Sequence, residues 1–220
     1  MPIYRHLEKF KYDTSLYNFK ECLCDIYQTQ DLSQLHKKYS EQISFNSHDS
    51  SSPLHKLFYN LQQEKLSTTY LQFLKNVIYP ILGEPFYYQL VPCIRLGFPG
   101  RKWLDRYHLD SDYNHPIYEL NINLVISPTS MTSSQLRIEE APGSGNYLFL
   151  DQSYGEFCFI NHIGCLHGSE VNTSDETFCS IDFRLILEKD ENVAFSSTKS
   201  VNTKKKFMRG SYFSSEALSL

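Results

Sequence analysis

The sequence has no apolar run long enough to cross a bilayer. Its longest apolar stretches, residues 77–82 and 120–126, are far shorter than the roughly 20 consecutive apolar residues that a membrane-spanning helix needs. Residues 1–10 mix charged with apolar side chains and lack the continuous apolar segment of a secretory signal. We therefore expect a cytoplasmic protein that does not bind a membrane.

The chain has no excess of positive charge. Lys and Arg total 21 against 25 Asp and Glu, which gives a formal net charge of −4. This balance provides no long-range attraction for a phosphate backbone, and no basic groove with interleaved aromatic residues is evident. Nucleic acid is therefore not an expected partner, and a small-molecule substrate is the preferred interpretation.

Cysteine is sparse, with six residues in 220. A chain of this length can bury a core without a disulfide framework, and a cytoplasmic location would keep the cysteines as thiols. Cys22 and Cys24 form a CxC that could bind a metal ion, but no second Cys/His pair follows at zinc spacing. A structural role for this pair is favoured.

The composition suits one globular domain with extensions. Hydrophobic residues make up 41% and aromatic residues 15% of the chain, enough to fill a core. We divide it into a polar N-terminal extension (1–52) that ends in a serine-rich stretch, a domain of helices and strands (53–188), and a C-terminal tail partly packed on that domain (189–220). The basic cluster in the tail, Lys204, Lys205, Lys206 and Arg209, is interpreted as a solvated loop, with a contact to a ligand phosphate as the alternative.

Apolar periodicity predicts two helices followed by a sheet. Apolar residues recur at helical spacing over 54–61 and 70–81. Strict alternation then predicts strands over 118–126 and 179–187, and shorter strands are expected at 87–96, 136–139, 147–150 and 156–161. We expect a mainly β fold with flanking helices: a double-stranded β-helix, that is, a jelly-roll, cupin-like barrel. The apolar strand faces should lie under the helices and the polar faces inside the barrel.

The strongest chemical motif is the HxD formed by His108 and Asp110. Residues two apart in an extended segment project to the same side, so both side chains can bind one metal ion. His167 and Arg184 follow in the order typical of non-haem Fe(II) oxygenases, in which two histidines and a carboxylate occupy one face of an octahedron. A buried arginine would suit the distal carboxylate of a dicarboxylate cosubstrate.

Structural roles are the alternative for each of these residues. His108 and Asp110 could form an exposed turn, and Arg184 could pair only with Asp182 on its own strand. His115 and His55 show no comparable partners in the sequence. His162, five residues before His167, is the reserve candidate for the second histidine.

Three segments resemble the Fe(II)/2-oxoglutarate oxygenase-like family linked to streptomycin biosynthesis: YHLDSDYNHPIYELNINLVIS, LRIEEAPGSGNYLFLDQSYGEFCFINHIGCLHGSEVNTSDETFCSIDFRLI and FMRGSYFS. The resemblance extends over about 86–213. It implies a double-stranded β-helix with His108, Asp110 and His167 as iron ligands and with Arg184 binding 2-oxoglutarate. Arg95 and Asn121 correspond to residues that line the cosubstrate or substrate pocket. Arg137 stands where the family has an aromatic residue, so the substrate could differ.

The predicted activity is a dioxygenase that couples oxidative decarboxylation of 2-oxoglutarate to hydroxylation or desaturation of a small molecule. A sugar, an aminocyclitol and an amino-acid intermediate are the substrate classes considered. Retention of Asp110 favours hydroxylation over halogenation, because halogenating relatives replace this carboxylate. A cupin-type metal-binding isomerase, usually marked by HxH, and a catalytically silent jelly-roll binding module are the alternatives.

Overall fold

The structure, a computed structural model, describes residues 5–41, 43, 52–60, 64–104, 106–195, 198–201 and 204–220. The helices are α1 (Phe19–Ile26), α2 (Leu35–Lys38), α3 (Pro53–Asn60), α4 (Glu64–Phe73), α5 (Tyr79–Leu82) and α6 (Glu191–Ala194). A π-helical turn, η3 (Leu74–Ile78), joins α4 to α5, and the 3₁₀ turns are η1 (Leu32–Gln34), η4 (Asp110–Tyr113), η5 (Thr132–Ser134) and η6 (Glu188–Asp190). None of the helices in these described ranges is long and apolar enough to span a membrane.

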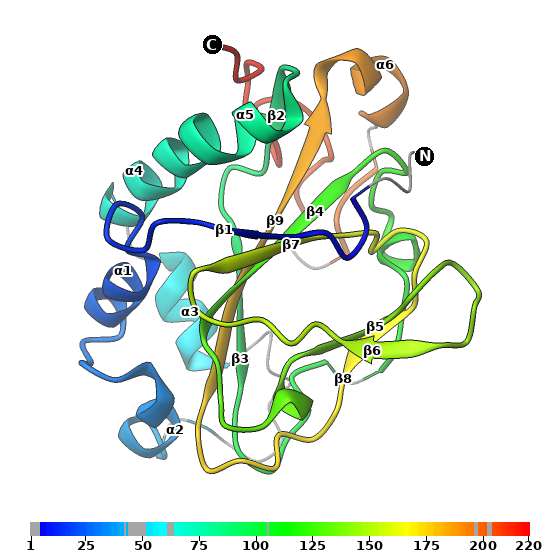
Figure 1. The fold of residues 1–220 in the computed structure, drawn as a ribbon. Coiled ribbons are helices and arrows are strands. Elements are labelled where there is room, and N and C mark those ends of the chain that lie inside the picture. Colours follow the sequence, from blue (N-terminus) through cyan, green and yellow to red (C-terminus); the bar gives the residue numbers. More distant parts are fainter. Residues whose placement is uncertain are drawn as a thin grey trace.

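The described residues contain nine strands, which form two antiparallel sheets (Figure 1). The strands are β1 (Lys9–Lys11), β2 (Phe86–Tyr88), β3 (Cys93–Gly97), β4 (Leu120–Ser127), β5 (Leu136–Glu139), β6 (Tyr147–Phe149), β7 (Glu156–Ile160), β8 (His167–Ser169) and β9 (Phe178–Leu187). The large sheet has the order β1-β7-β4-β9. On the side away from β4, β9 pairs with β3 along 178–182 and with β2 along 185–187. The small sheet has the order β6-β5-β8.

The chain alternates between the two sheets in the manner of a jelly roll. From β3 to β9 it passes from the large sheet to the small one and back, and a bridge between His108 and His167 adds one more residue pair beside β8. Among the described strands, no continuous pairing joins the two sheets into a closed barrel. The mainly β architecture with helices is confirmed, whereas the predicted barrel closure is not seen.

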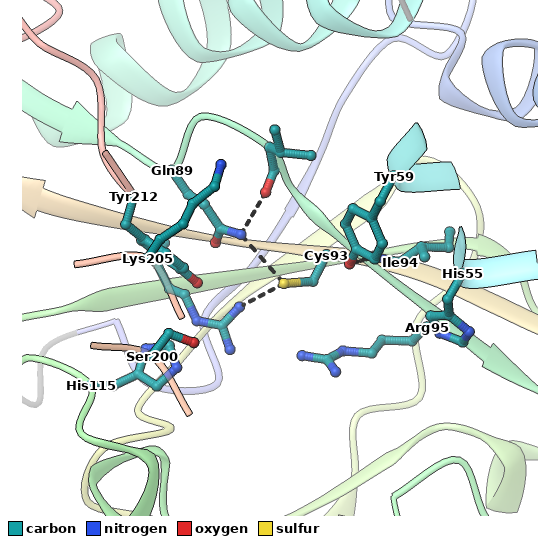
Figure 2. A pocket seen from close by; sticks show the side chains of 12 residues that line it. His55, Tyr59, Gln89, Cys93, Ile94, Arg95, His115, Ser200, Lys205 and Tyr212 are labelled. Carbon is teal, nitrogen blue, oxygen red and sulfur yellow. Dashed lines mark hydrogen bonds between the residues drawn. The ribbon is translucent and has the colours of Figure 1, made fainter. Parts of the chain in front are cut away.

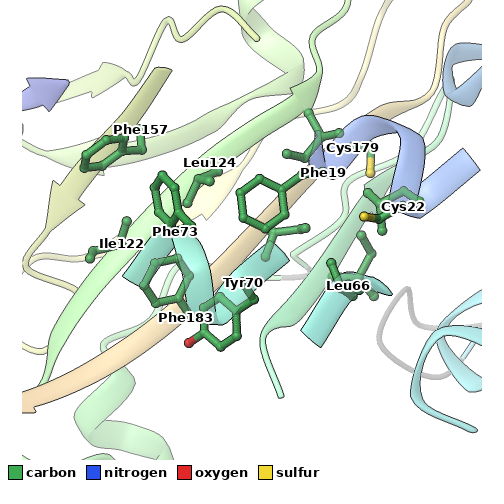
Figure 3. Close-up of a cluster of buried hydrophobic side chains, with 14 of the residues drawn as sticks. Phe19, Cys22, Leu66, Tyr70, Phe73, Ile122, Leu124, Phe157, Cys179 and Phe183 are labelled. Carbon is green, nitrogen blue, oxygen red and sulfur yellow. The ribbon is translucent and has the colours of Figure 1, made fainter. Parts of the chain in front are cut away.

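Helices cover the outer face of the large sheet. Ile122 and Leu124 of β4 and Phe183 of β9 lie under the helices and are fully buried there (Figure 3). Tyr70 and Phe73 of α4 pack edge-on against the rings of Phe183 and Phe157, with centroid distances of 5.0 and 5.5 Å. The alternating apolar residues of the strands therefore face the helices, as the sequence predicts.

A second apolar cluster fills part of the space between the sheets. It joins side chains from both sheets and from the loop after β3: Trp103, Val125, Leu136, Ile138, Leu150, Cys158, Ile160, Cys165 and Phe178. The Trp103 indole N–H donates to the carbonyl oxygen of Ser134 at 2.9 Å. The rest of this interior holds polar residues of β4 and β9, and these form the site described below.

The N-terminal segment contributes more to the fold than a polar extension would. Phe19 and Leu23 of α1 and Leu32 of η1 are fully buried in the helix-covered core, and β1 extends the large sheet. The serine-rich residues 47–51 and Leu61 lie outside the described residues. All six cysteines are free thiols, and Cys22 is buried in the same core.

The C-terminal tail runs back along the domain. Phe207 and Phe213 are fully buried beside β2, and the backbone N–H of Ser214 donates to the carbonyl oxygen of Tyr88 at 2.8 Å. The predicted strand over 87–96 is interrupted, because β2 ends at Tyr88 and β3 begins at Cys93. Pro92, which has no backbone N–H to donate, lies in this interruption.

Candidate metal centre

The structure brings His108, Asp110 and His167 together in the interior between the sheets. The backbone N–H groups of His108 and His167 each donate to the carbonyl oxygen of the other residue, at 3.0 and 3.1 Å. Their imidazole rings lie with centroids 4.4 Å apart. Asp110 begins η4, and its backbone N–H donates to the carbonyl oxygen of His162 at 2.9 Å. Residues 57 positions apart in sequence thus share one site.

Hydrogen bonds orient the two rings for metal binding. Nδ1 of His108 lies 3.0 Å from the carbonyl oxygen of Arg106, and Nδ1 of His167 lies 3.1 Å from that of Cys165. A carbonyl oxygen only accepts, so Nδ1 carries the proton and Nε2 keeps its lone pair. Oδ1 of Asp110 lies 3.7 Å from Nε2 of His108 and 3.5 Å from Nε2 of His167. One donor atom from each residue lies within 4.8 Å of the other two, so the three side chains could hold one metal ion.

The protonation states also suit a metal ion. Burial, together with the neighbouring His167, lowers the pKa of His108 to about 4, so its ring is neutral at pH 7. Burial alone would raise the pKa of Asp110, but Arg184 outweighs this effect and, with His162 and His167, holds the pKa well below its usual range. Neutral imidazole and ionised carboxylate are the forms that bind metals. The residues therefore fit a divalent metal ion such as Fe(II).

His162 lies beside this site rather than in place of His167. Its ring stacks on that of His167 at a centroid distance of 4.0 Å and an angle of 10°. Its Nδ1 lies 3.6 Å from Oδ2 of Asp110, and neither ring nitrogen makes a hydrogen bond to a described residue. Burial lowers the pKa of His162 to about 3, so the stacked ring is neutral.

Arg184 is surrounded by carboxylates. Its Nη2 lies 2.9 Å from Oδ2 of Asp110, its Nη1 lies 2.6 Å from Oδ2 of Asp182, and its Nε lies 3.1 Å from Oε1 of Glu119. Glu119 in turn accepts from Nδ1 of His115 at 2.9 Å. The side chain of Arg184 is only 3% exposed, so this network is fully buried.

Arg95 and Asn121 lie near Arg184. Arg95 binds Asp182 through Nε at 2.6 Å and through Nη2 at 3.2 Å. Burial would raise the pKa of Asp182, but Arg95 and Arg184 outweigh it and hold the pKa at about 2. Asn121 pairs with Arg184 in the β4–β9 register, and both polar atoms of its buried amide lack a hydrogen-bond partner in the described structure.

A pocket of about 430 Å³ adjoins this network (Figure 2). Its lining comes from α3, the β2–β3 connection, β3, the loop after η4, β9 and the C-terminal tail: His55, Tyr59, Gln89, Val91, Cys93, Ile94, Arg95, His115, Arg184, Ser200, Lys205 and Tyr212. A second, smaller cavity is lined by His108, Asp110 and His167. Arg95 lines both cavities and therefore lies between the metal-binding side chains and the larger pocket.

Sequence reasoning missed part of this site. It gave His115 and His55 no partners, yet His115 binds Glu119, and Nδ1 of His55 lies 2.8 Å from the Ser52 hydroxyl. It described the tail lysines as a solvated loop, but Lys205 lines the pocket. The spacing of His115 and Glu119, together with the position of Glu119 beside the polar strand face, is the signal that could have found this pair.

Arg137 lies on the outer face of the small sheet. Its guanidinium pairs with Glu170 at 3.1 Å and lies over the rings of Tyr147 and Phe149, while its neighbours Leu136 and Ile138 point into the core. The departure from the family at this position therefore does not place an arginine in the interior of the site.

A mainly β fold of two facing sheets with a buried His-Asp-His group defines a candidate mononuclear metalloenzyme. No family model matches the chain. It is 23% identical over 181 residues to the streptomycin biosynthesis protein StrG of Streptomyces griseus. The alignment covers 81% of this chain and 83% of StrG.

Solved structures also resemble this fold. EvdMO1 superposes with a TM-score of 0.54 at 15% identity, over 84% of this chain and 48% of EvdMO1, so the chain spans about half of that protein. SnoK, a non-haem α-ketoglutarate-dependent carbocyclase from nogalamycin biosynthesis, has a TM-score of 0.45 at 14% identity, over 79% of this chain and 75% of SnoK. At 15% identity the likeness to EvdMO1 concerns the fold alone.

Proposed function

We propose that this protein is an Fe(II)/2-oxoglutarate-dependent dioxygenase of the double-stranded β-helix type that hydroxylates or desaturates a small molecule. The observation that carries the proposal is the arrangement of His108, Asp110 and His167, with both Nε2 atoms turned toward Oδ1 of Asp110. When bound there, iron would supply the activation of dioxygen that accompanies oxidation of 2-oxoglutarate to succinate and carbon dioxide.

The chain's own residues prepare the site for this chemistry. Trp103, Leu104 and Leu136 line the cavity beside the triad and limit access of water to it. Arg184 and Arg95 are buried cations and Asn121 carries a buried amide. These groups could bind a dicarboxylate cosubstrate beside the metal-binding side chains. Because Asp110 occupies a ligand position, no site is left there for a halide, which favours hydroxylation or desaturation over halogenation.

A substrate that carries a hydroxyl or ammonium group suits the larger pocket. Oε1 of Gln89 is buried and has no hydrogen-bond partner among the described residues. The orientation of this amide is fixed, because its Nε2 donates to the carbonyl oxygen of Val91 at 2.6 Å and to Sγ of Cys93 at 3.3 Å. The free acceptor would pair with a hydroxyl or ammonium group. Together with the likeness to StrG, this supports a sugar, an aminocyclitol or an amino-acid intermediate.

The test is turnover of 2-oxoglutarate without added substrate. We expect the reduced, Fe(II)-loaded protein to consume oxygen and 2-oxoglutarate slowly and to release succinate in equal amount. Asp110→Ala should abolish this turnover because it removes one of three protein ligands. His36→Gln, outside the site, is the matched histidine control and should retain the parental rate.

Each rival function gives a different result in the same assay. A cupin-type isomerase would bind metal but would produce no succinate, and a silent binding module would show neither metal-dependent oxygen consumption nor succinate. Turnover in the Asp110→Ala protein equal to that of the parent would contradict the metal site.

A further inference from the structure

His115 forms a carboxylate–histidine pair with Glu119. Nδ1 of His115 lies 2.9 Å from Oε1 and 3.1 Å from Oε2 of Glu119, whose side chain is 1% exposed. An ionised carboxylate only accepts, so Nδ1 carries the hydrogen. In the neutral ring Nε2 then keeps its lone pair, and this atom makes no hydrogen bond to a described residue. The pair therefore holds an imidazole acceptor in one tautomer.

Aromatic packing fixes the direction of the His115 ring. Its centroid lies 4.6 Å from that of Phe207 and 6.0 Å from that of Tyr212. The side chain of His115 is 8% exposed and lines the pocket of about 430 Å³ (Figure 2). Because Nδ1 is bound to Glu119, Nε2 is the ring nitrogen left for an occupant of this pocket.

Gln89 adds a second acceptor to the same pocket. Its Nε2 donates to the carbonyl oxygen of Val91 and to Sγ of Cys93, and its Oε1 has no partner among the described residues. Sγ of Cys93 lies 3.4 Å from Nη1 of Arg184, and Oε1 of Glu119 lies 3.1 Å from Nε of the same residue. The side chains that orient the two acceptors thus contact one guanidinium, which keeps both acceptors within reach of a compact ligand.

Two acceptors without donors restrict the chemistry of the ligand. The cosubstrate 2-oxoglutarate, as a dianion, offers only acceptor oxygens and satisfies neither of them. An amino acid whose ammonium group is its only donor satisfies one. A diol or an amino alcohol donates to both. A pocket built to accept from such groups rejects analogues that lack them, because its own polar atoms would then stay unpaired.

We infer that Nε2 of His115 and Oε1 of Gln89 are specificity-determining acceptors that select a substrate with two hydrogen-bond donors, a polyol or an amino alcohol. Glu119 is the positioning residue that fixes the tautomer of His115. This inference rests on the proposed function, and it narrows the substrate classes considered there to the sugar and the aminocyclitol.

The experiment uses the protein loaded with Zn(II), which does not activate oxygen, and saturated with 2-oxoglutarate at about pH 8, where an ordinary imidazole is neutral. Three probes are titrated and followed by saturation-transfer NMR: myo-inositol, cyclohexanol and L-alanine. The first carries several hydroxyl donors on a six-membered ring, the second carries one donor on the same ring, and the third has only its ammonium donor. Signals of 2-oxoglutarate in the same spectra report cosubstrate binding separately.

Two variants each remove one acceptor. His115→Phe keeps an aromatic ring in the contacts with Phe207 and Tyr212, and Gln89→Leu removes the amide. We expect the parent to bind myo-inositol more tightly than cyclohexanol or L-alanine. Each variant should lose roughly 3- to 10-fold in myo-inositol affinity, as for one hydrogen bond between uncharged groups. His36→Phe, outside the pocket, is the matched control and should equal the parent.

Glu119→Gln tests the positioning role. Nitrogen NMR of the imidazoles, with the His115 signals identified by their absence from His115→Phe, should show an unprotonated Nε2 in the parent. A glutamine presents either its oxygen or its amide hydrogens to Nδ1, so Glu119→Gln should populate both tautomers and lose a few-fold in myo-inositol affinity. A loss of packing alone would leave the tautomer unchanged.

A folded His115→Phe protein with parental myo-inositol affinity would overturn the inference. The same holds for a parent with a protonated Nε2, or for one that binds myo-inositol no more tightly than cyclohexanol. If His115→Phe does not fold, Gln89→Leu and the tautomer of the parent decide. Displacement of myo-inositol by 2-oxoglutarate would also overturn the inference, because the acceptors would then lie in the cosubstrate site. A parent that binds myo-inositol but no 2-oxoglutarate would instead contradict the proposed function.

Discussion

The two carboxylate oxygens of Asp110 face different neighbours. Oδ1 faces Nε2 of His108 and of His167, while Oδ2 accepts from Arg184 at 2.9 Å. The shared carboxylate is thereby restricted to one oxygen for a metal ion. A charge-assisted hydrogen bond to the second oxygen also keeps the group ionised in a fully buried position. The site therefore depends on a residue, Arg184, that offers no metal ligand.

His55 provides a pH prediction at the scale of a single residue. Burial, with a contribution from Arg95, lowers the pKa of His55 from 6.5 to about 4. Between these values the unfolded chain binds a proton that the folded protein does not, so the free energy of unfolding falls as pH decreases from 6.5 to 4. At pH 4, His55 should have lowered the free energy of unfolding by on the order of 3 kcal/mol relative to its value above pH 6.5.

Urea unfolding of the parent and of His55→Gln across this pH range measures the effect. The variant should lose stability less steeply than the parent below pH 6.5, and the two slopes should agree above it. An NMR titration of the His55 ring gives the folded-state pKa directly. A value near 6.5 would contradict the prediction.

Among the helices, the α4–η3 segment fixes the large sheet to the N-terminal helix. Phe73, at the end of α4, is fully buried and packs edge-on against Tyr12, Tyr17, Phe19 and Phe157 at centroid distances of 5.3 to 5.6 Å. Phe73→Ala should lower the free energy of unfolding by about 3–5 kcal/mol, because it removes transfer energy and leaves a cavity. The variant should still bind Fe(II), since the residue lies on the far face of the sheet.

Chemical unfolding and an iron titration of the same preparation test this prediction. Leu71→Ala, on the exposed side of the same helix, should change stability by less than about 1 kcal/mol. A Phe73→Ala protein as stable as Leu71→Ala would contradict the packing described for this helix.

The elements that sequence predicts well are those with their own periodic signal. β4 and β9 alternate apolar and polar side chains over 8 and 10 residues and were expected within two residues of their bounds. β1 has only three residues and depends on pairing with β7, so no local pattern reveals it. α1 did carry a signal, because Phe19, Cys22, Leu23 and Ile26 recur at helical spacing after the N-cap Asn18.

At the scale of the whole molecule, the site is formed by contacts between distant segments. The order of His108, Asp110, His167 and Arg184 in the sequence was sufficient to propose a metal site. The partners of Arg184 could not be predicted, because its contact with Glu119 depends on the register of β4 against β9 and its contact with Asp110 depends on the position of η4. Neither the register of these strands nor the position of η4 can be derived from the spacing of residues in the sequence.

The most direct test of the central claim is an anaerobic titration that follows the iron-to-ketoacid charge-transfer band. Fe(II) followed by 2-oxoglutarate should produce this band in the parent, with one iron bound per chain. His108→Ala and His167→Ala should lose the band. His162→Asn, which replaces the ring stacked on His167, should keep it. A folded, iron-loaded parent that develops no band with 2-oxoglutarate would contradict the account.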